Sequence, residues 1–302
     1  MDVIHLPFEL WTLIFDLLDT KVQIRLIQLC KTIKDKIFIT DLCNIDYKLK
    51  IKLNGDIIKK YPYIKKLYAY GDCGIGDDSL IGLNLVELNV CFNPKIKKIN
   101  HMNNLRILYA CSDCGIDDDS LSGLNLYELN AFNNPKIKKI NHMTNLRKLN
   151  ASGHSGVNDD SLVGLNLVEL HAYNNPNIIK INHMTNLRIL NASLRSGIGD
   201  DDLVGLNLVE LSAVDNPKIR KINHMKNLRI LCAPYNCGVD DNSLIGLNLV
   251  ELYTYNNPKI KKINHMTNLR ILNGIPQLWN GVFPLHNVSK KHYEDEKDRL
   301  AG

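Results

Sequence analysis

The sequence has few aromatic residues, no long apolar run and no strong excess of charge of one sign. Aromatic residues make up 7% of the 302 positions, two of them tryptophan, and the formal net charge is +5 at pH 7. No uninterrupted apolar segment reaches the roughly 18 residues that a membrane-spanning helix needs. A basic excess this small does not indicate nucleic-acid binding by itself, because such binding depends on one sign of charge gathering on one face.

The N-terminal segment MDVIHLPFELWTLIFDLL has no basic region and no small-residue cleavage site. It also contains Asp2, His5, Glu9 and Asp16, so we expect no secretory signal peptide. The chain has eight cysteines, and without a secretory signal these favour a reducing compartment. We therefore expect a cytoplasmic or nuclear protein.

The dominant feature is a repeat of 41 residues. The stretch INHMTNLRIL at residues 181–190 recurs almost unchanged at 99–108, 140–149, 222–231 and 263–272. Each unit divides into two half-repeats of about 20 residues that fit the pattern L-x-x-L-x-(small apolar)-x-x-x-x-x-I. The half-repeats begin at Ile64, Leu85, Leu105, Leu126, Leu146, Leu167, Leu187, Leu208, Leu228, Leu249 and Leu269.

This pattern resembles the leucine-rich repeat in period and in the spacing of its apolar positions. The resemblance implies a solenoid of ten full coils and a fragment, with one coil for each complete half-repeat. In such a solenoid the fourth and sixth positions lie in a short strand, and strands of successive coils pair in parallel. We therefore predict an α/β fold class, with a parallel sheet on the concave face of the solenoid.

Two sets of polar residues recur at turns and are predicted to be structural. Asparagine occupies the ninth position of every first half-repeat and can bond backbone groups of a tight turn. These residues are Asn93, Asn134, Asn175, Asn216 and Asn257. In second half-repeats a small residue is followed by glycine, which suits a positive φ. The small residues are Cys73, Cys114, Ser155, Ser196 and Cys237.

Repeated histidines and cysteines do not predict a metal site. Identical positions lie two coils apart, about 9.6 Å at ~4.8 Å per strand, whereas a Zn–N bond is about 2.0–2.1 Å. The histidines are therefore predicted to be structural: His101, His142, His183, His224 and His265. Cys91 and Cys111 both occupy a seventh position on neighbouring strands, so we expect them to be adjacent and able to cross-link. No metal or cofactor is predicted.

The pattern of charged residues predicts that they set the register between neighbouring coils, and it does not predict a nucleic-acid site. Position 14 alternates in sign along successive coils. The series reads Asp77, Lys98, Asp118, Lys139, Asp159, Lys180, Asp200, Lys221, Asp241, Lys262. We expect these side chains to form an exposed ladder of opposite charges, in which a slip by one coil sets like charges together. Steep salt dependence would instead indicate nucleic acid.

No pattern predicts catalysis, since the chain has no GxSxG, HExxH or glycine-rich phosphate loop. Glutamate recurs at the third position of first half-repeats, and we expect each to neighbour the arginine of the following half-repeat. The expected pairs are Glu87 with Arg106, Glu128 with Arg147, Glu169 with Arg188, Glu210 with Arg229, and Glu251 with Arg270. We therefore expect a protein that is not an enzyme.

Positions five and seven vary between repeats while the framework around them does not. Their side chains should project from the concave sheet, and aromatic residues among polar ones are typical of a recognition surface. The predicted substrate-binding residues are Tyr68, Tyr70, Tyr109, Phe132, His171, Tyr173, Tyr235, Tyr253 and Tyr255. The alternative is that these positions drift because nothing constrains them.

Residues 6–37 show helical apolar periodicity, and their residues resemble the F-box. The matching positions are Leu6, Pro7, Glu9, Leu10, Ile14, Phe15, Leu17, Leu18, Arg25, Leu26, Cys30 and Lys31. Ile33 stands near the place where that family commonly has an aromatic residue. The resemblance implies a three-helix segment that binds a Skp1-like adaptor, and through it a cullin. The adaptor-binding residues would be Leu6, Pro7, Leu10, Ile14, Leu17 and Leu18.

We therefore predict an F-box-like helical domain over residues 1–45, a linker and N-terminal cap over 46–63, the solenoid over 64–272, and a C-terminal cap with a mobile charged tail over 273–302. The combination resembles F-box/leucine-rich repeat proteins of giant amoeba-infecting DNA viruses, which implies a substrate-recognition subunit of a ubiquitin ligase acting in a host cell. The alternative is a non-enzymatic scaffold whose N-terminal helices only cap the solenoid, as solenoid ends require.

Overall fold

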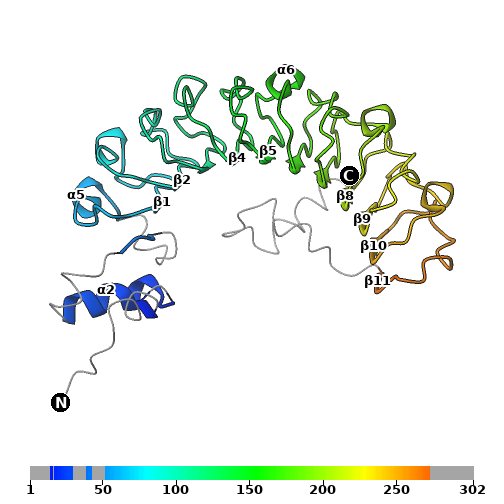
Figure 1. The fold of residues 1–302 in the computed structure, drawn as a ribbon, viewed down its shortest axis with the longest axis horizontal. Coiled ribbons are helices and arrows are strands. Elements are labelled where there is room, and N and C mark those ends of the chain that lie inside the picture. Colours follow the sequence, from blue (N-terminus) through cyan, green and yellow to red (C-terminus); the bar gives the residue numbers. More distant parts are fainter. Residues whose placement is uncertain (1–13, 16, 30–38, 43–51, 273–302) are drawn as a thin grey trace, which may run out of the picture.

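A computed structural model describes residues 14–15, 17–29, 39–42 and 52–272. The chain forms an open arc, and a single parallel sheet lines its inner side (Figure 1). The sheet has eleven strands, and their spatial order follows their order in the sequence. The predicted solenoid with a parallel sheet on its concave face is therefore confirmed. The predicted cap and tail over residues 273–302 lie outside the described residues.

Each coil contributes one short strand, and neighbouring strands pair without a shift in register. Leu88, at a fourth position, lies opposite Leu67 on one side and Leu108 on the other. The strands span positions three to five, so they begin one residue before the predicted segment. They are β1 Lys66–Tyr68, β2 Glu87–Asn89, β3 Ile107–Tyr109, β4 Glu128–Asn130, β5 Lys148–Asn150, β6 Glu169–His171, β7 Ile189–Asn191, β8 Glu210–Ser212, β9 Ile230–Cys232, β10 Glu251–Tyr253 and β11 Ile271–Leu272.

Short helical turns occupy the outer side of several coils. They are α5 Gly55–Ile58, η1 Asp77–Ser79, α6 Asp159–Leu162, η2 Asp200–Leu203 and η3 Asn242–Leu244. Their starts are capped locally: at α6 the Asn158 Oδ1 accepts from the Ser161 N–H, and the Ser161 Oγ accepts from the Asn158 N–H. The Asp-rich runs of second half-repeats thus form turns of the outer side.

The core is one continuous column of apolar side chains between the sheet and the outer turns. In a single coil Leu167, Leu170, Ala172, Ile178 and Ile181 are all fully buried. Burial of one leucine or isoleucine contributes about 1.5–3 kcal/mol. Because these positions repeat in every coil, each coil buries its apolar side chains only by stacking on its neighbours.

One helix of the N-terminal region is described, α2 at Thr20–Leu29. Phe15 is buried in the same core as the coils, and Ile24 and Leu26 pack against that core. Before β1, Asp41 forms a parallel bridge with Lys66, so parallel pairing reaches back beyond the first predicted coil. The other two predicted helices fall largely outside the described residues. No helix in the described ranges is long and apolar enough to cross a bilayer.

Candidate functional site

The asparagine at the ninth position of each first half-repeat is buried and makes the same bonds in all five repeats. Asn175 Nδ2 donates to the carbonyls of Ala151 at 2.7 Å and Val157 at 3.1 Å, and its Oδ1 accepts from the Asn177 N–H at 3.0 Å. Asn93, Asn134, Asn216 and Asn257 repeat this set. The predicted structural role is confirmed, because these bonds satisfy backbone groups inside the solenoid.

The repeated histidines join neighbouring coils on the outer side. The Nε2 atoms of His142 and His183 lie 3.2 and 3.3 Å from the carbonyl oxygens of Leu121 and Leu162 in the preceding coil. The same contact recurs at His224 and His265. The structural assignment of these four histidines is confirmed. Across the described residues, no group of three or more His, Cys, Asp or Glu side chains could hold a metal ion.

The glycines after the small turn residues are required by close packing, which corrects the expectation of a positive φ. A Cβ atom at Gly115 would lie 2.1 Å from the carbonyl oxygen of Ile96, and one at Gly156 would lie 2.4 Å from that of Pro135. The backbone φ is instead positive elsewhere, for example at Gly71 and at the outer-side Gly82. These turn glycines therefore let the backbones of successive coils approach.

Position 14 stacks in alternating sign as predicted, and within the described ranges each aspartate bonds the backbone of the next coil without an ion pair to a lysine side chain. The Asp118 Oδ1 accepts from the backbone N–H groups of Lys138 at 2.6 Å and Lys139 at 2.8 Å. Asp77, Asp159, Asp200 and Asp241 make the equivalent pair of bonds. These two backbone donors lower the pKa of Asp241. The alternating order of charges is therefore as predicted, but the partners of each carboxylate are the backbone amides of the next coil and not the lysine ammonium groups.

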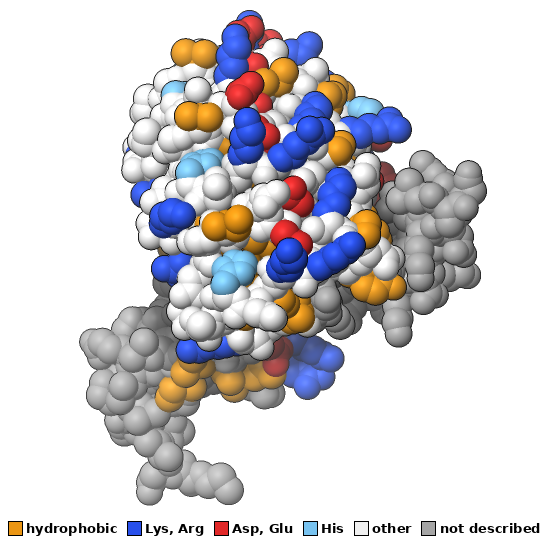
Figure 2. Space-filling view, turned by 90° about the vertical axis from the view of Figure 1, so that its right-hand side faces the viewer, with side chains coloured by type: hydrophobic (Ala, Val, Ile, Leu, Met, Phe, Trp, Pro, Cys, Tyr) orange, Lys and Arg blue, Asp and Glu red, His pale blue; other side chains and the backbone are white. Residues whose placement is uncertain are grey.

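The face of the molecule in Figure 2 mixes both signs of charge, with lysine and arginine side chains beside acidic ones. The lysines of first half-repeats also serve the framework: Lys95 Nζ donates to the Cys73 carbonyl at 3.1 Å, and Lys259 Nζ donates to the Cys237 carbonyl at 2.9 Å. This intermingling differs from the single-sign stripe that nucleic-acid binding requires.

The predicted contacts between the glutamates and the arginines are also wrong. Arg106 Nη1 donates to the carbonyls of Asn103 at 3.0 Å and Leu105 at 2.9 Å, and Arg147, Arg188 and Arg229 repeat this. The reason is the alternation of side chains along a strand. The arginines stand at position two and the glutamates at position three, so the two sets do not face the same side.

The five glutamates instead stand on the concave face, and their partners differ from coil to coil. Glu87 pairs with Lys66 Nζ at 3.3 Å, one strand earlier. Glu169 pairs with Lys148 Nζ at 3.3 Å and with His171 Nε2 at 2.8 Å. The hydrogen bond and charge of His171, followed by the charge of Lys148, lower the pKa of Glu169.

Tyrosine hydroxyls serve two of the remaining glutamates. Tyr109 donates its hydroxyl to Glu128 at 3.1 Å across neighbouring strands, and burial together with the Glu128 charge raises the pKa of Tyr109. Tyr253 donates to Glu251 Oε2 at 2.6 Å within its own strand. Glu210 makes no hydrogen bond or ion pair with any described residue. Its pKa is raised by burial and then by the charges of Glu169 and Glu251.

The predicted substrate-binding residues do not share one degree of exposure. Tyr70, Tyr235 and Tyr255 are exposed at 39%, 39% and 59%. Four others are half-buried: Tyr68, Tyr109, Phe132 and Tyr173. Their role in binding stays a prediction, but all seven present at least part of a ring on the concave side of the arc.

His171 and Tyr253 are buried, which corrects the expectation that all nine residues project openly from the sheet. His171 is held by Glu169, as described above, and its Nδ1 has no hydrogen-bond partner within the described part of the chain. Tyr253 forms a small apolar cluster with Val214 and Cys232, separate from the main core. The physical reason is that each of these side chains bonds the glutamate two residues earlier in its own strand and so turns back along the sheet.

Position eight has a left-handed backbone in every complete coil, although its residue type varies. Phe92 and Tyr235 have φ of 60° and 57° and exposed side chains. Others are Gly71, Ser112, Asn133, Gly153, Leu194, Asp215, Asn174 and Asn256. This backbone conformation could not be predicted from the residue types, because glycine stands at only two of these positions. A bulky residue at positive φ is strained, and such strain is typical of functional surfaces.

Phe92 and Tyr235 each form an aromatic pair with a tyrosine, and the two pairs lie toward opposite ends of the arc. The rings of Tyr70 and Phe92 are 5.4 Å apart between centroids in an edge-to-face arrangement. The rings of Tyr235 and Tyr255 are 6.1 Å apart and nearly perpendicular. Phe92 was missed by the sequence prediction, which considered only the fifth and seventh positions of its coil. Two exposed aromatic pairs thus flank a concave surface of glutamates and small polar residues.

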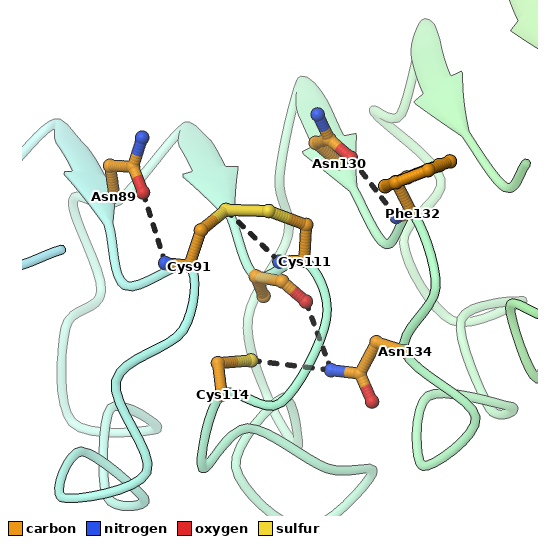
Figure 3. Close-up of a disulfide and its surroundings, with 8 residues drawn as sticks. Asn89, Cys91, Cys111, Cys114, Asn130, Phe132 and Asn134 are labelled. Carbon is orange, nitrogen blue, oxygen red and sulfur yellow. Dashed lines mark hydrogen bonds between the residues drawn. A yellow bond between two sulfur atoms is a disulfide. The ribbon is translucent and has the colours of Figure 1, made fainter. Parts of the chain in front are cut away.

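Cys91 and Cys111 are joined by a disulfide that links the coil of β2 to the coil of β3 (Figure 3). Their Cα atoms are 4.7 Å apart, within the usual range for a disulfide. The predicted adjacency of the two residues and their ability to cross-link are confirmed. Cys114, also drawn in Figure 3, is a buried thiol that accepts from Asn134 Nδ2 at 3.3 Å. Burial raises the pKa of Cys114.

The predicted adaptor-binding residues fall into two groups. Leu6, Pro7 and Leu10 lie outside the described residues. Ile14 and Leu17 are exposed at 39% and 87%, and Leu18 is half-buried. Phe15, between them, points into the core. One side of this segment therefore packs on the solenoid while another presents apolar side chains to solvent.

No family model and no curated protein matches the chain. Among solved structures, an internalin (inlF) from Listeria monocytogenes aligns at 17% identity and a TM-score of 0.37, over 74% of this chain and 90% of that one. Yeast Rad7, in a complex with Elc1, aligns at 17% identity and a TM-score of 0.42, over 73% and 78%. Internalin C2 (inlC2) of Listeria monocytogenes aligns at 17% and 0.27, over 73% and 83%. Similarity at this level transfers no function to this chain.

Proposed function

We propose that this chain is a non-enzymatic receptor that holds a protein partner on its concave face, and that its N-terminal helices attach it to a Skp1-like adaptor and a cullin in a ubiquitin ligase. The main support is the pair of exposed aromatic clusters, Tyr70 with Phe92 and Tyr235 with Tyr255. Aromatic side chains are enriched where proteins bind one another. Two of these rings are held on a strained backbone.

The adaptor part of the proposal rests on the exposed side of the N-terminal segment. Ile14 and Leu17 are exposed at 39% and 87% while Phe15 is buried in the core. Apolar side chains next to each other on a surface are typical of a protein-binding face. Leu6, Pro7, Leu10 and Leu18 belong to the same proposed face because the F-box resemblance assigns them to it.

The chemical role of such a receptor is positional. It raises the effective concentration of substrate lysines near a charged conjugating enzyme, and it makes or breaks no bond itself. In this proposal the repeats select the substrate and the helices provide the attachment. A cytoplasmic or nuclear location belongs to the same proposal. In such a compartment most cysteines are kept reduced, so Cys91 and Cys111 would be a dithiol there.

The test is binding of the full-length chain to purified Skp1, measured by calorimetry. A double variant, Ile14→Ala with Leu17→Ala, should lose binding and keep the unfolding midpoint of the wild type, because both side chains are exposed. The matched control is Val163→Ala with Val204→Ala, two side chains of the outer surface with 62% exposure each. The control should bind as the wild type does.

A scaffold whose helices only cap the solenoid is the second candidate function, and one observation favours it. Phe15, Ile24 and Leu26 pack on the core that the coils share, as a cap must. Absence of Skp1 binding by the folded wild type would select this alternative. The concave face would then serve a partner without any link to ubiquitin.

A further inference from the structure

Glu210 differs from the four other glutamates at the same position of the repeat. Each of the others has a partner: a lysine ammonium for Glu87, a lysine and a histidine for Glu169, and a tyrosine hydroxyl for Glu128 and Glu251. Glu210 has none among the described residues, although it stands on the same face of the same sheet. A half-buried carboxylate without a partner loses part of its hydration and gains nothing in return.

The missing partner has three causes, and the first is that Asn191 stands in β7 where Tyr109, the partner of Glu128, stands in β3. Lys148, one strand before Glu169, is replaced before Glu210 by Ile189. His171 and Tyr253, which reach back to the glutamates of their own strands, correspond to Ser212 in β8. The serine is too short to reach, and its Oγ lies 2.9 Å from Ser193 Oγ instead.

Aliphatic side chains stand on both sides of this carboxylate. Ile189 in β7 and Ile230 in β9 are the direct neighbours of Glu210 in the sheet. At the spacing of parallel strands their side chains lie about 4.8 Å away on the same face. Ile230 also packs against the cluster of Val214, Cys232 and Tyr253. The two side chains that flank the carboxylate in the sheet are therefore apolar.

We propose that Glu210 is the anchoring subsite for an arginine or lysine side chain of the protein partner. The carboxylate receives the charged head, and Ile189 and Ile230 contact the methylene stem. Arginine and lysine side chains can make both contacts at once, because their methylene stems are apolar and their heads are charged. The chain itself shows the geometry at Glu169, where Lys148 supplies the same kind of head from the preceding strand. This inference rests on the proposed binding of a protein at the concave face.

The sign of the charge excludes an acidic partner segment at this place. Glu210 already lies near Glu169 and Glu251, whose charges act on it unfavourably. Across the whole third position, five glutamates face two lysines, Lys66 and Lys148, so the concave floor is acidic although the chain as a whole has a formal net charge of +5. A cationic side chain from outside relieves the repulsion that the unpaired carboxylate creates.

The experiment screens the full-length protein against short synthetic peptides of random sequence with one fixed arginine. Parallel libraries fix lysine, or the neutral isosteres citrulline and norleucine, at the same place. Peptides selected with arginine or lysine should bind about tenfold or more tightly than their neutral counterparts, as expected for a charge pair shielded from water. Comparison of the arginine and lysine libraries decides which head the subsite prefers.

Three variants locate the preference. Glu210→Gln should abolish the discrimination between arginine and citrulline. Glu128→Gln is the matched control, because its amide oxygen can still accept from Tyr109, and it should preserve the discrimination. Ile189→Lys should place an ammonium beside Glu210, as Lys148 does beside Glu169, and should abolish the selection while the carboxylate stays in place.

The outcomes separate the subsite from the function on which it rests. Peptides that bind without regard to charge, or a Glu210→Gln variant that still prefers arginine, would overturn the subsite and leave concave-face binding intact. Failure of every library to bind would count against the proposed function as well. An Ile189→Lys variant that selects arginine as the wild type does would also overturn the assignment.

Discussion

The buried asparagines and the concave glutamates both recur every 41 residues, but only the asparagines keep the same partners in each repeat. Asn93, Asn134, Asn175, Asn216 and Asn257 bond the same three backbone groups. The glutamates meet lysine, tyrosine or histidine, and Glu210 has no partner among the residues that the structure describes. Repetition of a residue therefore does not mark it as framework. A residue belongs to the framework when its contacts also recur in every repeat. A recurring residue whose contacts change from coil to coil belongs to the surface that can determine binding specificity.

The largest difference between the two sets should appear in stability. Asn175→Ala leaves the carbonyls of Ala151 and Val157 and the N–H of Asn177 without partners. At about 1–3 kcal/mol for each unsatisfied group, the free energy of unfolding should fall by about 4 kcal/mol in urea denaturation. Asn177→Ala, an exposed neighbour, is the control and should stay within about 0.5 kcal/mol of the wild type. Equal effects of the two substitutions would contradict the framework role.

The disulfide should give the next largest effect. Cys91 and Cys111 are 20 residues apart in sequence, and closing a loop of that length stabilises by about 3 kcal/mol in the chain-entropy model. Reduction with dithiothreitol should lower the free energy of unfolding by that amount. The variant Cys91→Ser with Cys111→Ser, which has no disulfide to lose, should not respond to the reductant. A wild type insensitive to reduction would show that these coils are held by packing alone.

A smaller effect separates backbone bonds from ion pairs on the outer side. Asp118→Ala removes two bonds to the amides of Lys138 and Lys139 and should cost about 1 kcal/mol. Lys139→Ala should change the free energy of unfolding by less than about 0.5 kcal/mol. If the lysine substitution costs as much as the aspartate one, side-chain pairing would be the better description. Thermal denaturation at low ionic strength is sensitive enough to decide.

The strained position eight predicts a stabilising substitution of similar size. Ser112 has φ of 56°, a region that costs a residue with a Cβ about 1 kcal/mol relative to glycine. Ser112→Gly should raise the free energy of unfolding by up to about 1 kcal/mol. The control is Asp113→Gly at the next residue, where the backbone φ is not positive, and it should not stabilise the protein. A lower free energy of unfolding for Ser112→Gly would mean that the extra backbone entropy that glycine loses on folding outweighs the relief of strain.

The smallest effect concerns Glu210 and depends on pH. Because its pKa is raised in the folded state, the neutral form is favoured on folding, so the stability that this group contributes at acid pH is lost as the pH rises through the folded pKa. Glu210→Gln should therefore be more stable than the wild type at neutral pH, and the difference should vanish at acid pH. Glu169 behaves in the opposite sense, because its pKa is lowered and its contribution is lost as the pH falls. Urea denaturation at a series of pH values from acid to neutral measures the contributions of both glutamates to the free energy of unfolding.

The sequence period was sufficient to predict the coils, the parallel sheet, the buried asparagines and the adjacency of Cys91 and Cys111. It failed where the competing partner was a backbone group. The carboxylate of Asp118 and the guanidinium of Arg106 both bond backbone atoms, whose positions a residue pattern does not give. The left-handed position eight was missed because only two of its ten residues are glycine. Phe92 was missed for the same reason.

The most direct test of this account is the titration of the concave glutamates by NMR of their side-chain carboxyl carbons in the full-length protein. The account predicts that Glu169 titrates below the ordinary glutamate range, because His171 and Lys148 hold its charged form, and that Glu210 titrates above it, because burial and the neighbouring glutamates oppose its charge. Glu169→Gln and Glu210→Gln assign the two signals. Titration of both carboxyls at the same pH would contradict the claim that one repeated residue stands in different surroundings along the face.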